Sequence, residues 1–242
     1  MNAAKREIAE EKKRQTQKIR IGVYAYAFES FVLPNLANAI ENHVFECRIW
    51  DSARLKAELS KGTLDVIFTD RAPEEDEVEV VRLFKEQIMV SLPSSSEFAS
   101  RQSLFHSDLA KLNPYLPFDA SGYTKWFEQV LKAAGVEAPL ANGVSFKEYL
   151  YTKDSLERSH MTSSFIMRFL PTAARRVLIP LTEEIGTRDI YMAYQKRSAD
   201  RLKPLLAYIQ TYQDRLFTGS AFLPYFLFPS EQSNLLFCPD SE

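Results

Sequence analysis

Apolar and polar positions follow two alternating periods over the first 70 residues of the chain. Short apolar runs, each about as long as a strand, are separated by segments in which apolar residues recur every three or four positions, as in a helix. The expected strands are residues 19–23, 44–50 and 64–68, and the expected helices are residues 31–40 and 53–60. This alternation of strand and helix is typical of a parallel sheet flanked by helices.

Residue types at the helix ends agree with this pattern. Asp51 or Ser52 can cap the second helix, and Gly62 can end it. Pro34 falls in the first turn of the first helix, where proline is tolerated.

Beyond residue 77 the pattern is less regular, and Pro93-Ser-Ser-Ser interrupts it at a possible domain crossing. Residues 78–84 and 87–92 read as two strands around a turn. Further strands are expected at 113–118, 164–170, 175–181 and 189–194, and further helices at 125–134, 155–161 and 199–216.

Composition and charge narrow the class of protein. Hydrophobic residues make up 45% and charged residues 26% of the 242, as in ordinary globular proteins. A net charge of −2 argues against a surface built around nucleic-acid phosphates. Two cysteines are too few for a disulfide framework or a metal cluster. With neither a bilayer-length apolar segment nor a signal sequence, we expect a reduced cytoplasmic protein without metal or cofactor.

Polar side chains follow the third expected strand directly. Thr69, Asp70 and Arg71 come after the apolar run 64–68, and residues 24–30 follow the first strand. Ligands of open α/β sheets bind beyond the carboxyl ends of the strands. Helix N-termini at that edge favour an anionic or carbonyl-bearing ligand. Both segments are therefore expected at a ligand-binding edge.

Catalytic motifs are missing from the sequence. It has no Ser/His/Asp set, no carboxylate pair of defined spacing, no P-loop and no dinucleotide-binding glycine turn. The acidic run 73–77 is better explained as a solvated loop than as a metal site, because nothing fixes the geometry of its carboxylates. We therefore expect that the chain is not an enzyme.

Four segments, in this order, resemble one family over about residues 18–214. They are Ile19–Val23 with Pro34 after it, Lys61–Phe68 with its Gly-x-Leu-Asp element, Phe169–Pro171 with Arg176–Leu181, and Asp189–Tyr194 before a long helix. The set resembles the effector-binding domain of LysR-type transcriptional regulators.

The resemblance implies an α/β fold, a two-lobed clamshell like the type II periplasmic binding proteins. Residues 1–17 would be the end of a linker helix and 217–242 a C-terminal extension. Lobe I would comprise 18–92 plus 190–216, and lobe II 93–189. Strands near 89–92 and 189–192 would join the lobes as hinges.

The resemblance also implies a function. A small-molecule effector would bind between the lobes and change the geometry of a homodimer or tetramer, and thereby promoter control. DNA would be contacted only through a winged helix-turn-helix module that these residues do not include, and no membrane would be involved. For the homodimer we expect helices 31–40 and 125–134 to form the interface. The alternative is a solute-binding protein of a transport system with the same clamshell, which would require export.

The resemblance places seven effector-binding candidates on the sequence. They are Tyr24, Tyr26, Ser30, Thr69, Asp70, Ser121 and Tyr123. Relatives often carry hydroxyl residues after the first strand, where this chain has Ala25, Ala27 and Phe28, and this difference favours a larger or aromatic ligand. Five of the candidates also have a structural explanation: Tyr24 and Tyr26 as core aromatics, Thr69 as a β-branched strand end, Asp70 as part of a solvated pair with Arg71 or of a contact between the lobes, and Ser121 as a turn residue.

Overall fold

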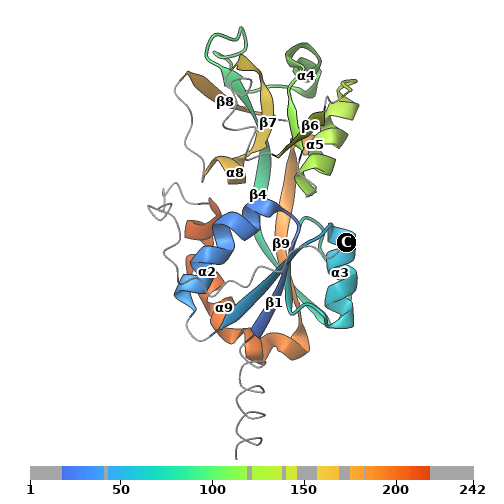
Figure 1. Ribbon diagram of the computed structural model, residues 1–242, viewed down its shortest axis with the longest axis vertical. Helices are drawn as coiled ribbons and strands as arrows, with labels where there is room; N and C mark the ends of the chain where they lie inside the picture. Colours follow the sequence, from blue (N-terminus) through green and yellow to red (C-terminus); the bar gives the residue numbers. More distant parts are fainter. Residues whose placement is uncertain are drawn as a thin grey trace, which may run out of the picture. The chain divides into compact units, whose positions relative to one another are not determined.

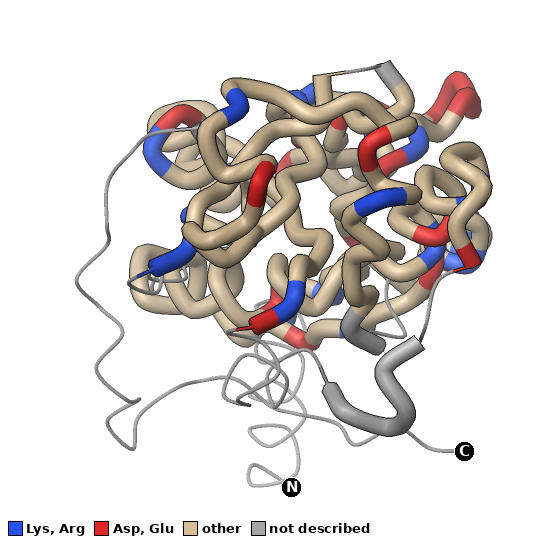
Figure 2. The backbone as a smooth tube through the Cα atoms, turned by 90° about the horizontal axis from the view of Figure 1, so that it is seen from above, with Lys and Arg blue, Asp and Glu red and all other residues tan. Residues whose placement is uncertain are grey.

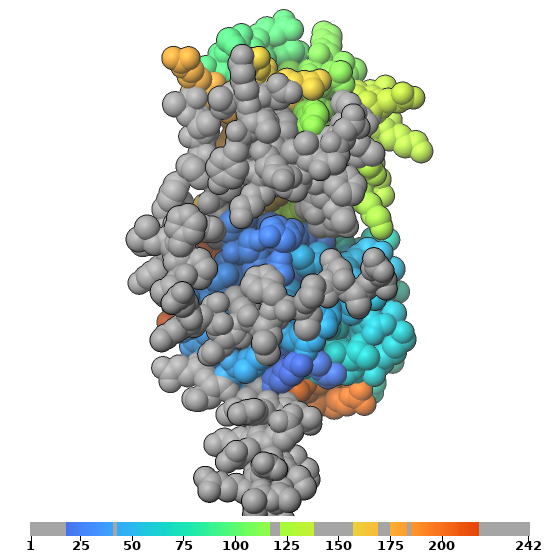
Figure 3. All heavy atoms as spheres, in the orientation of Figure 1, coloured from blue at the N-terminus to red at the C-terminus, as the bar shows by residue number. Residues whose placement is uncertain are grey.

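The computed structural model describes residues 18–40, 43–118, 122–137, 140–145, 157–168, 175–182 and 184–218 (Figure 1). In the space-filling view of Figure 3 the other residues are grey. The described residues form two compact units, the first made of 18–83 and 191–218 and the second of 84–190. Strands β4 (Val78–Pro93) and β9 (Thr187–Gln195) each contribute residues to both units.

The first unit is built on a sheet with the strand order β2-β1-β3-β9. Strand β1 (Lys18–Val23) pairs in parallel with β2 (Val44–Ile49) and β3 (Val66–Thr69), and β3 pairs antiparallel with β9. The three strands predicted from the first 70 residues, and their parallel arrangement, are therefore confirmed.

Helices connect these strands on both sides of the sheet. A π-helical turn, η1 (Phe28–Val32), and α2 (Leu33–Ala39) lead from β1 to β2, and α3 (Ser52–Lys61) leads from β2 to β3. The order β2-β1-β3 reverses the direction of the second crossover, so α2 and α3 lie on opposite sides of the strands (Figure 1). After β9 the chain continues through the short 3₁₀ turn η3 (Lys196–Ser198) into α9 (Ala199–Gln213) and a second π-helical turn, η4 (Asp214–Thr218).

The sequence signals for α3 are confirmed in detail. The carboxylate of Asp51 accepts a hydrogen bond from the backbone N–H of Arg54 at 3.0 Å, and Gly62 ends the helix with a φ of 75°. Gly22 in β1 lets α3 pack closely on the sheet, because a Cβ there would lie 2.5 Å from Leu55 Cδ2.

The second unit is built around β4. This strand pairs antiparallel with β7 (His160–Ser163) and β8 (Arg176–Pro180), while β5 (Leu116–Phe118) and β6 (Leu140–Ser145) form a separate parallel pair. Its helical elements are α4 (His106–Leu112), α5 (Gly122–Ala133), α8 (Ser164–Met167) and the short 3₁₀ turn η2 (Glu184–Gly186).

Three expectations for this unit are wrong. Residues 78–92 form one strand rather than two, because Glu86 at the expected turn points inward with Phe84 and Ile88 and has buried partners. The segment expected as a strand from Ser164 begins as helix α8, because the Ser163 hydroxyl accepts a hydrogen bond from the N–H of Ile166 at 3.1 Å and caps it. In the same way His160, expected at the end of a helix, opens β7.

Charged residues of both signs are scattered along the described part of the backbone (Figure 2). Within the described ranges no helix is both long and apolar enough to span a lipid bilayer.

Candidate functional site

Five of the seven candidates lie at the carboxyl edge of the first unit's sheet. Strands β1 and β3 are parallel neighbours with Val23 opposite Phe68, so the segments that follow them emerge side by side. The N–H of Tyr24 donates to the carbonyl of Phe68 at 3.1 Å and joins the two segments. The arrangement brings Tyr24, Tyr26 and Ser30 to the same edge as Thr69 and Asp70.

The aromatic residues at this edge belong to the core. Tyr24 is fully buried, with its ring centroid 5.4 Å from that of Phe28. Phe28 in turn contacts Phe68 at 5.3 Å and stacks on Phe217 of η4 at 5.9 Å. Tyr26, by contrast, is 49% exposed. Of the two tyrosines, Tyr26 therefore has a ring that reaches solvent, and Tyr24 is part of the core beneath it.

The polar candidates at this edge have partners within the chain. The buried hydroxyl of Thr69 accepts from the N–H of Arg71 at 3.2 Å and donates to its carbonyl at 3.3 Å. Asp70 accepts from the Ser52 hydroxyl, at the start of α3, at 2.5 Å. Ser30 is half-buried within η1. A ligand at this edge would compete with these local hydrogen bonds.

In the second unit, Tyr123 is part of a buried polar cluster, whereas Ser121 lies outside the described residues. The Tyr123 hydroxyl donates to Glu86 Oε1 in a short hydrogen bond. Glu86 Oε2 accepts from Arg188 Nε at 3.0 Å, and the Ser163 hydroxyl donates to the Tyr123 oxygen at 3.4 Å. We call Glu86, Tyr123, Ser163 and Arg188 the Glu86 cluster.

Aromatic rings enclose the guanidinium of this cluster. The Cζ atom of Arg188 lies 4.0 Å from the ring centroid of Trp126 and 4.7 Å from that of Tyr123. Both distances are within the range of a favourable cation–π contact. Its Nη1 also reaches the carbonyl of Gly122 at 3.5 Å. The guanidinium is thereby held in one orientation, with its Nε directed at Glu86.

Burial keeps the Tyr123 phenol protonated. Glu86 is fully buried, Tyr123 is 2% exposed, and the Arg188 side chain is 8% exposed. Burial, and after it the negative charge of Glu86, raise the pKa of Tyr123 well above its ordinary value. The phenol therefore stays protonated and acts as a hydrogen-bond donor to the carboxylate.

Sequence reasoning missed Glu86 and Arg188. The signal for Glu86 was its spacing, since it is in phase with the buried Phe84, Ile88 and Val90 along a two-residue period. Because Lys85-Glu86 was interpreted as a turn, the position of Glu86 on the buried face of the strand was not recognised. Arg188 carries no comparable signal, because its partner lies 102 positions away in the sequence.

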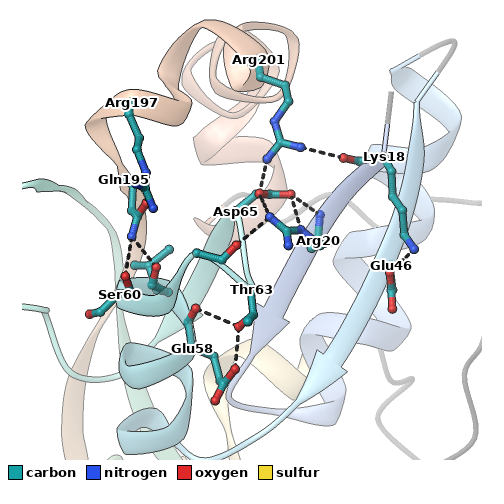
Figure 4. A network of polar contacts seen from close by, with 12 residues as sticks. Lys18, Arg20, Glu46, Glu58, Ser60, Thr63, Asp65, Gln195, Arg197 and Arg201 are labelled. Carbon is teal, nitrogen blue, oxygen red and sulfur yellow. Dashed lines mark hydrogen bonds and ion pairs between the residues drawn. The ribbon is translucent and has the colours of Figure 1, made fainter. Parts of the chain in front are cut away.

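A second charged network lies in the first unit, around Asp65 of the Gly-x-Leu-Asp element (Figure 4). Asp65 accepts from the backbone N–H of Arg20 at 2.8 Å, and from Arg20 Nε at 3.1 Å and Nη2 at 2.6 Å. Arg201 of α9 forms an ion pair with the same carboxylate and donates to the carbonyl of Lys18 at 3.1 Å. The network therefore joins β1, the start of β3 and α9.

The Asp65 network differs from the Glu86 cluster in its access to water. Asp65 is 2% exposed, but the side chains of Arg20 and Arg201 are 36% and 32% exposed. Burial raises the pKa of Asp65, but the hydrogen bonds from Arg20 and the charge of Arg201 outweigh it and hold that pKa below its ordinary value.

His160 is a buried, uncharged residue of the second unit. Its Nδ1 lies 3.0 Å from Arg176 Nη2, which acts as the donor. Burial, together with the charge of Arg176, lowers the pKa of His160 to about 3. Over the part of the chain that the structure describes, no group of three or more His, Cys, Asp and Glu residues is arranged to hold a metal ion.

The comparison with protein families gives one match. The family model described as the LysR substrate binding domain matches residues 12–214. No curated protein sequence matches the chain.

Solved structures of similar fold include a regulatory domain and a DNA-bound protein. The reduced OxyR regulatory domain of Pseudomonas aeruginosa is 16% identical, with a TM-score of 0.63, and the match covers 80% of this chain and 97% of that one. An OxyR mutant of Corynebacterium glutamicum is 16% identical, with a TM-score of 0.65 and coverage of 87% and 70%. Full-length CbnR in complex with its target DNA is 14% identical, with a TM-score of 0.58 and coverage of 86% and 79%. These likenesses confirm the expected α/β fold, that of the type II periplasmic binding proteins.

Proposed function

Because the chain belongs to the family of LysR substrate binding domains, we propose that it is the small-molecule-sensing regulatory domain of a LysR-type transcriptional regulator. An effector bound between the lobes alters the oligomer geometry and thereby promoter control. The family match over residues 12–214 carries this proposal. The transport alternative is not favoured, because the family and the similar structures are those of regulators.

The proposed effector site in the first unit is the edge formed by Tyr24, Tyr26, Ser30, Thr69 and Asp70, and in the second unit it is Ser121 and Tyr123. In the first unit the parallel pairing of β1 and β3 supports this assignment, because ligands bind where such strands end. Tyr26 supplies an exposed ring there, while Thr69 and Asp70 supply polar atoms. No residue acts as a catalyst in this proposal.

Effector binding acts by shifting a population of conformations. A ligand favours one arrangement only through its differential affinity for that arrangement. Promoter DNA is contacted by a winged helix-turn-helix module outside these 242 residues, and the regulator works as a homodimer or tetramer in the cytoplasm. The homodimer interface uses the helices of residues 31–40 and 125–134. Sedimentation of the purified chain tests this part, and a monomer at micromolar concentration would contradict it.

A thermal-shift screen against metabolites, with aromatic compounds well represented, tests the sensing function. A compound at a hundredfold its dissociation constant stabilises a protein by about 2.7 kcal/mol. The double substitution Thr69→Val and Ser121→Ala is expected to weaken binding of a hit by about 1–3 kcal/mol, because ligand atoms lose their hydrogen-bond partners. Thr211→Val on the exposed side of α9 is the matched control and should leave the ligand-induced shift unchanged. Equal shifts in all three proteins would remove Thr69 and Ser121 from the site.

A further inference from the structure

The Glu86 cluster has the composition of a carboxylate-binding site. An arginine flanked by aromatic rings and the Tyr123 hydroxyl both donate to one carboxylate, and the Ser163 hydroxyl donates to the Tyr123 oxygen. That carboxylate belongs to the chain itself. We infer that Arg188 and Tyr123, supported by Ser163, form a carboxylate site that Glu86 fills, so that the effector is an uncharged aromatic compound. The ligand class in this inference rests on the proposed function.

The location of the cluster connects it with ligand binding. Tyr123 is the second residue of α5, two positions after the candidate Ser121, and Ser163 caps α8. The start of a helix favours ligand groups that accept hydrogen bonds, because the first N–H groups of a helix have no partner within it.

The hydrogen bonds match those that a free carboxylate receives. Each oxygen of Glu86 has a separate donor, Tyr123 for Oε1 and Arg188 for Oε2. Arginine is the preferred partner of carboxylates because its guanidinium is permanently charged and planar. Contacts within the chain position this guanidinium, because its Cζ lies 4.0 Å from the Trp126 ring centroid and its Nη1 reaches the Gly122 carbonyl.

Charge and burial exclude a second carboxylate. Glu86 and Arg188 neutralise each other in a place with almost no exposed surface. An effector carboxylate would have to displace Glu86 and leave it buried and uncompensated, which is strongly unfavourable. The surroundings are aromatic, with Trp126 stacked on Phe127 at 5.7 Å and Phe127 against Tyr123 at 5.7 Å. They favour an uncharged ring.

Chemical rescue of a truncated variant tests the carboxylate site. Glu86→Ala removes the carboxylate and leaves a space of its size beside Arg188. We expect acetate, at pH 7 and compared with chloride at equal ionic strength, to raise the melting temperature of this variant by about 2–4 °C, the usual shift for 1 kcal/mol in a chain of this size. The wild-type chain should show no difference between the two salts. Equal melting of Glu86→Ala in acetate and in chloride would overturn the inference.

Two control variants separate rescue from a general salt effect. The double variant Glu86→Ala/Arg188→Met lacks the cation and should not respond to acetate. Asp65→Ala removes a carboxylate whose two arginine partners reach water, and it should not prefer acetate either. An acetate response of the same size in either control would count against a built site.

The ligand class is tested on the wild-type chain, so this test does not depend on the variant folding. Matched pairs such as benzoate and benzamide, or phenylacetate and phenylacetamide, are compared by thermal shift. We expect only the uncharged member of a pair to stabilise the protein, and stabilisation by the carboxylate instead would overturn the assigned class. If no compound binds while acetate rescues Glu86→Ala, the carboxylate site is supported and the proposed sensing function is contradicted.

Discussion

The Asp65 network and the Glu86 cluster each place a carboxylate against arginine, but they differ in what surrounds the charges. Asp65 shares two arginines that are each about one-third exposed, so water can hydrate those arginines if the carboxylate is lost. Glu86 pairs with Arg188, whose side chain is 8% exposed and lies between aromatic rings. Loss of one charge is therefore expected to cost less stability in the Asp65 network than in the Glu86 cluster, because water can hydrate the remaining charges only in the Asp65 network.

The largest effect is expected from Arg188→Met. The substitution leaves Glu86 buried without a cation, and breaking a buried ion pair costs about 3–5 kcal/mol of folding free energy. Urea unfolding of the variant and the wild type measures this difference. The matched control is Glu86→Gln/Arg188→Met, which removes both charges and should recover most of the loss. A single variant as stable as the double variant would show that the pair contributes little.

A change of pH tests another buried contact of the second unit, the one between His160 and Arg176. The pKa of His160 is about 3 in the folded chain and about 6.5 in an unfolded one. Below pH 6.5 the unfolded chain therefore binds a proton that the folded chain does not, and stability falls as the pH is lowered toward 3. At pH 5 the loss from this group is about 2 kcal/mol relative to pH 8.

The variant His160→Asn isolates this contribution. Asparagine can still accept a hydrogen bond from Arg176 but does not titrate, so the fall in stability between pH 8 and pH 5 should be smaller by about 2 kcal/mol than in the wild type. Urea unfolding at the two pH values measures it. The same pH dependence in both proteins would mean that His160 is protonated in the folded state.

A smaller effect is expected from Asp65→Asn. The amide keeps part of the hydrogen bonding to Arg20, and water can solvate both arginines, so the loss is about 1 kcal/mol. It should shrink in 1 M salt, because exposed charges are screened. Asp200→Asn, on an exposed side chain of α9 paired only with an exposed lysine, is the control and should leave the urea midpoint where it was. A loss from Asp65→Asn as large as that from Arg188→Met would remove the contrast between the two networks.

The first unit could be predicted from the sequence because its signals are local. The β–α alternation, the cap at Asp51 and the terminating Gly62 depend on neighbours within a few residues, and all of them are found in the structure. The contact between Phe28 and Phe217 could not be predicted in this way, because the two residues are far apart in the sequence.

The second unit was predicted less well because its elements depend on distant partners. Strand β4 continues through Glu86, and Tyr123 and Arg188 both donate to its carboxylate. Ser163 is the last residue of β7 and caps α8. The pattern of apolar residues does not show this change from strand to helix. The sequence therefore predicted the carboxyl edge of the first unit's sheet from the order of its strands, whereas the Glu86 cluster became visible only in the structure.

The division of the chain between the two units also has a consequence for biosynthesis. The first unit needs residues 191–218, which supply its fourth strand, helix α9 and the stacked Phe217, whereas the described residues of the second unit all lie between 84 and 190. Domains tend to fold as they emerge from the ribosome. The second unit can therefore fold before the first. Although most of the first unit is translated earlier, the edge of its sheet at β3 stays unpaired until β9 has left the exit tunnel.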